Sequence, residues 1–231
     1  IGNSEIDLVE ELLYSIFNIG FDSFSMDDGS IVDEDICLEA IALARQLLRK
    51  YNRPSTSHLL ALFCLHAARI PAKIVEGALT SFFKQDRDLW NMKLFTLGFD
   101  YLKEIDSLNR YYLEALIASK YMTAENFDES HWKDLASLYE MLTHYHPSPI
   151  VTLNLCYVLH KVGRTDDAFQ RLADIESDLP AGHVYFSLVK AELLKSISPG
   201  ESQIIIDSVA DQLDQPVRKD FMLGNGFITI Q

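Results

Sequence analysis

The sequence predicts an all-α protein, an array of helical hairpins with one small β-hairpin near residues 73–83. Apolar residues recur every three to four positions through most of the chain, which is the spacing of amphipathic helices. One segment departs from this pattern, because β-branched residues there flank a Glu-Gly pair that suits a tight turn. In the second half, apolar positions coincide when the chain is shifted by about 34 residues, the tetratricopeptide period.

Three helices are predicted in the first third of the chain. The first carries an apolar stripe, formed by Leu8, Leu12, Leu13, Ile16 and Phe17. Residues 20–32 are rich in Asp, Ser and Gly and predict a loop, after which Asp33 or Asp35 caps the second helix. The Arg-Pro pair at 53–54 ends that helix, because proline cannot continue it. The third helix, residues 55–68, is so apolar that we expect burial on most sides.

The predicted β-hairpin has two short strands about a turn. The first strand spans residues 73–75, the second spans residues 78–83, and Glu76-Gly77 forms the turn between them. This hairpin is the only β element that we expect. A helix then follows from about residue 88 to residue 105, where apolar side chains again recur at helical spacing.

The second half of the chain predicts tetratricopeptide-like repeats. The shift of about 34 residues superimposes five pairs of apolar positions, which are Leu155 on Val189, Leu159 on Leu193, Leu172 on Ile206, Ile175 on Val209 and Leu179 on Leu213. Residues 111–121 and 132–145 form a degenerate earlier pair, and residues 217–227 a closing helix. Because one helical hairpin cannot bury its face alone, stacked neighbours share a core. We therefore divide the chain into an N-terminal half, residues 1–105, and a repeat half, residues 106–231.

The composition limits the partners of this chain. Asp and Glu number 34 against 20 Lys and Arg, which gives a formal net charge of −14. Such a chain repels phosphate backbones and anionic lipid surfaces, so we expect no direct nucleic-acid or membrane binding. A basic or mixed protein surface fits better. The three cysteines lie far apart and no signal peptide or membrane span is visible, which predicts buried thiols in a cytoplasmic protein.

No set of catalytic or metal-binding residues stands out in the sequence. His144 and His146 are two positions apart, which would put them on different faces of a helix, and His58 and His66 are two turns apart. The HExxH zinc motif, the GxSxG nucleophile elbow and the EF-hand spacing do not occur. We therefore expect no enzymatic activity, no metal and no cofactor.

Residues 84–91 hold the most distinctive polar cluster of the chain. Gln85, Asp86 and Arg87 stand just before Trp90, and apolar residues flank the cluster on both sides. An Arg fork can meet a carboxylate with two hydrogen bonds, so an Asp86–Arg87 pair could fasten the β-hairpin onto the helices. Arg and Trp are also common hot-spot residues of protein interfaces, so the cluster could instead be a recognition patch. The residues alone leave both interpretations open.

Five motifs follow one another along the chain. They are Phe17-Asn18-Ile19-Gly20-Phe21, the Leu-Glu-Ala-Ile helix at 37–45, the Leu-Leu-Ala-Leu helix with Leu-His-Ala-Ala-Arg at 59–69, Gln85-Asp86-Arg87 with Trp90, and Ser-Pro-Ile-Val with Leu-Asn at 148–154. Their order and spacing resemble the long C-terminal extension of a group of bacterial extracytoplasmic-function (ECF) RNA polymerase sigma factors. Two residues depart from that pattern. Ile19 replaces a Glu and Lys84 replaces an Asp, so any contact of those acids is altered here.

The resemblance implies a regulatory domain without enzymatic activity. In that family the extension is thought to control the sigma factor in place of a separate anti-sigma protein. The basic helix-turn-helix of the promoter-recognition domains has no counterpart in this acidic chain, and its first residue is Ile1. We therefore expect the extension alone, cut from a longer protein.

The functional hypothesis is docking on the sigma factor's own DNA-binding domains or on RNA polymerase. The repeat groove would add a second surface. The interaction residues that we expect are Gln85, Asp86, Arg87, Trp90, Asn18 and Gly20. The alternative is a free-standing tetratricopeptide-like adaptor unrelated to transcription.

Overall fold

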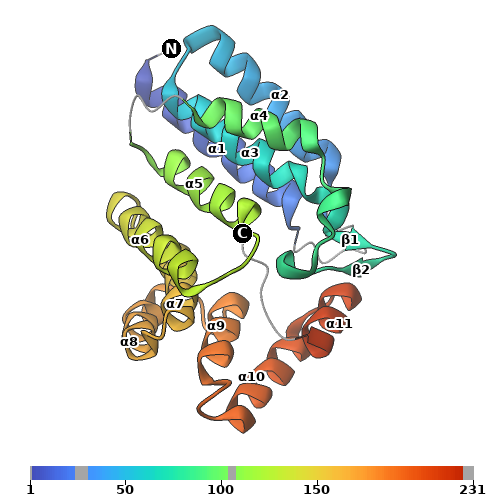
Figure 1. The fold of residues 1–231 in the computed structure, drawn as a ribbon, viewed down its shortest axis with the longest axis vertical. Coiled ribbons are helices and arrows are strands. Elements are labelled where there is room, and N and C mark those ends of the chain that lie inside the picture. Colours follow the sequence, from blue (N-terminus) through green and yellow to red (C-terminus); the bar gives the residue numbers. More distant parts are fainter. Residues whose placement is uncertain (1, 24–30, 104–107, 226–231) are drawn as a thin grey trace. The chain divides into compact units, whose positions relative to one another are not determined.

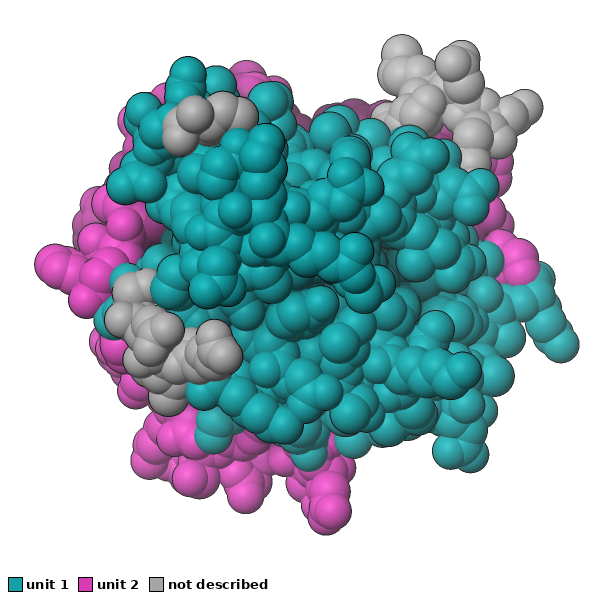
Figure 2. Space-filling model, turned by 90° about the horizontal axis from the view of Figure 1, so that it is seen from above, with its two compact units in different colours: residues 1–76, 85–123 teal, residues 77–84, 124–231 magenta. Residues whose placement is uncertain are grey.

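The computed structural model describes residues 2–23, 31–103 and 108–225, and these form a helical protein with one two-stranded sheet (Figure 1). The predicted fold class is confirmed. The chain divides into two compact units (Figure 2). Unit 1 comprises Ile1–Glu76 and Gln85–Thr123, and unit 2 comprises Gly77–Lys84 and Ala124–Gln231. No helix among the described residues combines the length and the apolarity needed to cross a bilayer.

Unit 1 is a helical bundle built around α3. Its helices are α1 (Asn3–Phe21), α2 (Glu34–Tyr51), α3 (Pro54–Ala68), α4 (Met92–Leu102) and α5 (Arg110–Thr123). α3 packs against each of the other four. Its apolar side chains surround the helix on all sides, and its four leucines and Phe63 are at most 3% exposed. The predicted burial of this helix is therefore confirmed.

Local signals set the boundaries of α2 and α3. The Asp33 side chain caps α2 by accepting a hydrogen bond from the Ile36 amide, at 3.1 Å from Oδ1. α2 ends at Tyr51, and Asn52 adopts a left-handed φ of 46°. Pro54 is the first residue of α3, where its fixed φ suits a helix start. Most of the loop predicted at 20–32 lies outside the described residues.

The β-hairpin is shorter than predicted. β1 (Ile74–Val75) pairs with β2 (Ala78–Leu79), and the two turn residues Glu76 and Gly77 both have positive φ, 53° and 79°. Positive φ at both central residues is the type I′ pattern, which matches the right-handed twist of paired strands. The predicted second strand, residues 78–83, ends at Leu79, and a 3₁₀ turn, η2 (Phe82–Lys84), takes the place of its last residues.

The helix predicted from residue 88 begins only at Met92. The Asn91 side chain accepts hydrogen bonds from the Lys93 and Leu94 amides, both at 3.2 Å, and so caps α4. A separate 3₁₀ turn, η3 (Arg87–Leu89), precedes it. Residues 104 and 105, the predicted end of this helix, lie outside the described residues.

Only part of the predicted α1 stripe is buried. Leu13 and Phe17 are in the core, and the Phe17 ring stacks on Phe63 of α3 with centroids 4.3 Å apart. The other three members are exposed: Leu8, Leu12 and Ile16. The reason is geometric, because α1 packs through the side that carries Ile6, Leu13 and Phe17, and the other three residues project from the neighbouring side.

Two glycines let helices of unit 1 approach closely. A Cβ on Gly20 would lie 2.8 Å from Ile36 Cγ2 and 3.0 Å from the Asp33 carbonyl oxygen, where the end of α1 meets the start of α2. A Cβ on Gly98 of α4 would lie 2.8 Å from Leu65 Cγ of α3. Both distances are below ordinary contact, so a side chain at either position would force the helices apart.

Unit 2 is a series of helical hairpins. Its helices are α6 (Glu129–Tyr145), α7 (Pro149–Lys161), α8 (Thr165–Ile175), α9 (Val184–Leu194), α10 (Pro199–Gln212) and α11 (Pro216–Asn225). α7 pairs with α8 and α9 pairs with α10, as the repeat predicts. The superimposed positions Leu155, Val189, Leu159 and Leu193 are all fully buried. α11 is the predicted closing helix, although residues 226 and 227 lie outside the described residues.

The two units differ from the predicted halves, residues 1–105 and 106–231. α5 was expected to start the repeat half, but it packs on α3 within unit 1. Gly77–Lys84 belongs to unit 2, where the Phe83 ring lies 4.9 Å from the Phe127 ring between centroids. Phe127 in turn lies 5.2 Å from Trp132. The Phe83–Phe127 contact is nonlocal in sequence, so the helical periodicity could not reveal it.

Candidate functional site at the signature turn

Residues 85–91, which we call the signature turn, have a fixed backbone in unit 1. Asp86 Oδ1 accepts a hydrogen bond from the Asp88 amide at 2.9 Å and so caps η3. The Trp90 amide donates to the Arg87 carbonyl at 3.1 Å. The Asn91 amide donates to the Ala68 carbonyl at 2.7 Å, which ties the turn to the end of α3. The turn is therefore closed by its own hydrogen bonds and tied to α3 at Asn91.

The side chains of Asp86 and Arg87 do not form the ion pair that the sequence analysis considered. The Asp86 carboxylate caps the backbone, and the Arg87 guanidinium lies 5.3 Å from the centroid of the Trp90 ring. A guanidinium over an indole face is a cation–π contact. Trp90 itself is 6% exposed and lies 6.1 Å from Phe95 between ring centroids, so its side chain is part of the core.

Two exposed apolar residues that the sequence did not single out lie in the signature turn and directly after it, at the first residue of α4. Leu89 is 42% exposed and Met92 is 55% exposed. Arg87 and Asp88 are exposed beside them, whereas Gln85 is half-buried. In a helix that began at residue 88, as predicted, Leu89 and Met92 would have lain on the faces of that helix. Only the recognition of Asn91 as the cap of α4 could have indicated that they are exposed.

Asn18 and Gly20 lie at the end of α1 and not in the signature turn. Asn18 is exposed, and its carbonyl accepts a hydrogen bond from the Asp22 amide at 3.0 Å. Gly20 is buried against α2. The end of α1 also contacts α3, because the Phe21 and His66 rings lie 5.2 Å apart between centroids. The two predicted segments therefore attach to the same end of α3.

Two buried cations fasten the end of α1. Lys73 Nζ donates to the Phe21 carbonyl at 2.5 Å and forms an ion pair with Asp22 at 3.3 Å. The Arg69 guanidinium lies 5.2 Å from the Phe21 ring centroid. Burial lowers the pKa of Arg69 to about 10, and burial with the nearby Arg69 and Lys73 lowers the pKa of His66 to about 3. His66 is thus neutral near pH 7, and the cluster has a structural role.

A polar cleft in unit 1 was not predicted from the sequence. Its volume is about 340 Å³, and it is lined by charged side chains of α1 and α5, by Arg53 just before α3 and by the first residues of α3. Glu10 is 2% exposed and accepts hydrogen bonds from the hydroxyls of Ser55, at 2.8 Å, and Thr56. Arg53 and Arg110 form ion pairs with acids of α1, at 2.7 and 2.9 Å. These charges are paired with one another within unit 1. We therefore interpret the cleft as the place where ion pairs connect α1 to α5 and to the start of α3.

We expect the stability of unit 1 to depend on pH through Glu114. Burial raises the pKa of this carboxyl to about 7, although Arg110 lies at 3.4 Å and opposes the shift. A raised folded-state pKa means that stability is full below about pH 4.5 and falls as pH rises toward 7. Glu114→Gln should remove this dependence and raise the free energy of unfolding at pH 8 by about 1–3 kcal/mol.

Urea unfolding at several pH values measures the Glu114 effect. Glu39→Gln, on the exposed surface of α2 in the same unit, is the matched control and should leave the pH profile unchanged. An identical pH profile for the parent protein and Glu114→Gln would show that this carboxyl does not titrate in the folded protein near neutral pH.

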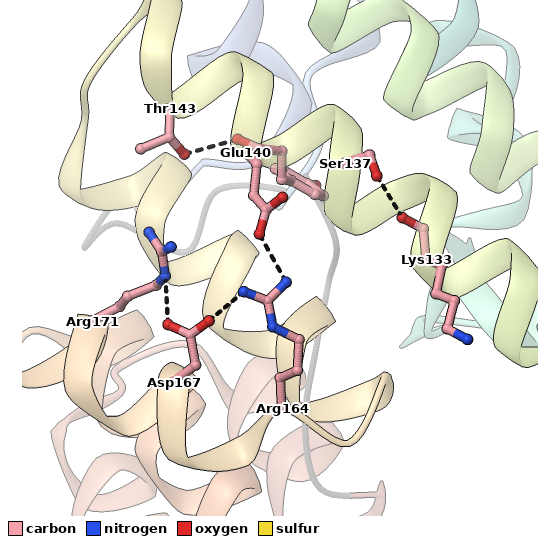
Figure 3. A network of polar contacts seen from close by, with 8 residues as sticks. Lys133, Ser137, Glu140, Thr143, Arg164, Asp167 and Arg171 are labelled. Atoms are coloured by element: carbon pink, nitrogen blue, oxygen red, sulfur yellow. Dashed lines mark hydrogen bonds and ion pairs between the residues drawn. The ribbon is translucent and has the colours of Figure 1, made fainter.

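A chain of ion pairs joins α6 to α8 in unit 2 (Figure 3). Arg164 bonds to Glu140 at 2.9 Å and also to Asp167, which in turn accepts from Arg171 at 2.9 Å. These side chains are partly exposed, so each pair contributes little stability. Their arrangement links the start of α8 to α6.

α7 and α9 are linked directly, along the predicted repeat groove. Tyr185 donates to Asn154 at 2.5 Å, and Lys161 forms an ion pair with Glu192 at 2.8 Å. Lys161 Nζ also lies 4.8 Å from the centroid of the Tyr157 ring. The polar side chains along the contact between α7 and α9 therefore bond successive repeats to one another.

The thiols are buried, as predicted. Burial raises the pKa of Cys37, Cys64 and Cys156 to about 12, so none is an activated nucleophile. Across the described ranges, no group of three or more His, Cys, Asp or Glu side chains is placed to hold a metal ion. The distinctive features of unit 1 are therefore structural clusters and an exposed turn.

Comparisons with known proteins give a family match and a relative. Residues 5–106 match the model of a family of unknown function, DUF6596. The chain is also 31% identical over 197 residues to the uncharacterized protein R00370 of Rhizobium meliloti (strain 1021). That alignment covers 82% of this chain and 45% of the relative, so the chain spans less than half of the relative's length. No solved structure matches the chain significantly.

Proposed function

We propose that this chain is a regulatory protein-interaction domain of an ECF-type sigma factor, without catalytic activity or cofactor, and that the signature turn is its docking surface. The build of the turn is the observation that supports this most. Trp90 and Asn91 anchor the backbone, while Arg87, Leu89 and Met92 remain exposed. A rigid turn loses little conformational entropy on binding, and Arg beside apolar side chains is a common hot-spot composition.

The proposed partner is the DNA-binding part of the same sigma factor or RNA polymerase. The resemblance of the ordered motifs to the sigma-factor extension supports this choice. The net charge of −14 supports a protein partner over nucleic acid. The repeat groove along α7 and α9 is the proposed second docking surface, since stacked repeats present such a face to partners.

Transcription from a promoter that depends on the encoded sigma factor tests the proposal. The variant to test is the full-length gene product with both Arg87→Ala and Met92→Gln. Loss of two hot-spot side chains, each worth about 1–2 kcal/mol, should change transcript output at least about tenfold. Circular dichroism should show an unchanged folded state, because both side chains are exposed.

Lys93→Ala is the matched control for this experiment. Lys93 is exposed on α4 next to Met92, but its amide, not its side chain, serves the Asn91 cap. We expect it to leave transcript output unchanged. Equal output from the parent protein and the Arg87/Met92 double variant would contradict docking through the turn. A protein that supports no promoter-specific transcription at all would favour the adaptor alternative.

A further inference from the structure

The exposed side of α1 is a continuous apolar stripe. Leu8, Leu12, Ile16 and Ile19 are 61%, 54%, 40% and 60% exposed. Their spacings of four, four and three residues place them on one face of the helix. The stripe runs for about 16 Å, or roughly three turns. We call these four residues the α1 stripe.

The α1 stripe does not belong to the core of unit 1. The core side of α1 is complete without it, because Ile6, Leu13 and Phe17 are each at most 5% exposed and pack within the bundle. Single exposed leucines are ordinary, but a straight row of four on one helix is typical of an interaction face. A straight row also has the shape that packs into the groove of another helix.

The charges beside the α1 stripe are acidic. α1 contains Glu5, Asp7, Glu10 and Glu11 and no Lys or Arg. Glu5 is exposed on the same side of the helix, since it lies three residues before Leu8. At the other end, α2 begins with exposed Glu34 and Asp35, and the Asp33 amide donates to the Gly20 carbonyl at 2.7 Å. Carboxylates therefore lie near both ends of the stripe.

The acids on the far flank of α1 have partners inside the protein. Asp7 pairs with Arg53 and Glu11 with Arg110, at 2.7 and 2.9 Å. Because Arg53 and Arg110 neutralise these two acids, the negative potential along the stripe comes mainly from the carboxylates at its two ends. Self-association through the stripe would bring the same acids of two chains together, and each chain carries a net charge of −14. An anionic lipid surface would be repelled for the same reason.

We propose that the α1 stripe is a docking site for a basic amphipathic helix supplied by a partner protein. Leucine-type side chains of that helix pack between Leu8, Leu12, Ile16 and Ile19, and its Lys or Arg residues lie beside the carboxylates at the two ends. The site is separate from the signature turn and does not depend on the docking role proposed for it.

A labelled peptide of Leu and Lys measures binding to the stripe. A length of about 18 residues, with leucines at helical spacing, gives roughly five turns. We expect saturable binding by fluorescence anisotropy, weakened at least about tenfold when salt is raised from about 0.05 to about 0.5 M. The double variant Leu12→Gln with Ile19→Gln should weaken binding at least about tenfold, since it removes two of the four apolar contacts.

Matched controls make the peptide test specific. Ile204→Gln changes a 70% exposed isoleucine on α10 of unit 2 and should bind as the parent does. Arg87→Ala should also bind as the parent does, which separates this site from the signature turn. Equal binding by the Leu12/Ile19 variant and the parent would overturn the proposal, and so would equal binding of a Leu/Glu peptide. A parent dimer that the Leu12/Ile19 variant converts to monomer in sedimentation would show a second copy as the occupant and also overturn it.

Discussion

Trp90→Ala should lower the free energy of unfolding by about 3–5 kcal/mol, because it removes a buried aromatic side chain and leaves a cavity. The change would also remove the surface on which the Arg87 guanidinium lies. Denaturation followed by circular dichroism measures the loss. Tryptophan fluorescence is unsuitable, since the chain has two tryptophans and the variant loses one of them.

Arg87→Ala is the control that separates anchoring from recognition. Arg87 is exposed, so its removal should leave the denaturation midpoint close to that of the parent. The anchoring role of the turn would then belong to Trp90 and the docking role to Arg87. Equal destabilisation by the two changes would mean that Arg87 also helps to hold the turn in place.

Gly20→Ala should lower the free energy of unfolding by about 1–3 kcal/mol, even though alanine favours helices by about 1 kcal/mol. The added Cβ would lie 2.8 Å from Ile36 Cγ2 and 3.0 Å from the Asp33 carbonyl. One of these neighbours is backbone and the other is β-branched, so neither can move without shifting α2 away from α1. Urea denaturation at constant pH measures the change.

Gly200→Ala provides the matched control for Gly20→Ala. Gly200 also lies in a helix, α10, but no atom stands within 4 Å of the position that its Cβ would take. The same chemical change should therefore stabilise the protein, by up to about 1 kcal/mol. A stabilising effect at both glycines would contradict the close approach of α1 and α2.

The sequence predicts those parts of the fold that local chemistry decides. Asp33 caps a helix through its own side chain, Pro54 starts one through its fixed φ, and Glu76-Gly77 turns through its positive φ. The burial of one side of α1 depends instead on packing against α2 and α3, which lie elsewhere in the sequence. The sequence therefore predicted the apolar spacing of the first helix but not which of its apolar residues are buried.

The same distinction applies to the candidate site. The burial of Trp90 follows from its large apolar ring beside an apolar helix, so the sequence could predict it. The exposure of Leu89 and Met92 depends on where α4 begins, which the Asn91 cap decides. The polar cleft brings together Glu10 of α1, Arg53 before α3 and Arg110 of α5, and no spacing in the sequence could reveal it.

The apolar surface of α3 has a consequence for synthesis on the ribosome. α3 is complete at Ala68, but two of the helices that cover it, α4 and α5, end only at Leu102 and Thr123. A nascent chain that ends between Ala68 and Thr123 leaves part of α3, an almost wholly apolar helix, exposed to water. Chains truncated before residue 123 should therefore aggregate or recruit chaperones, and the translation rate through this stretch should influence the yield of folded protein.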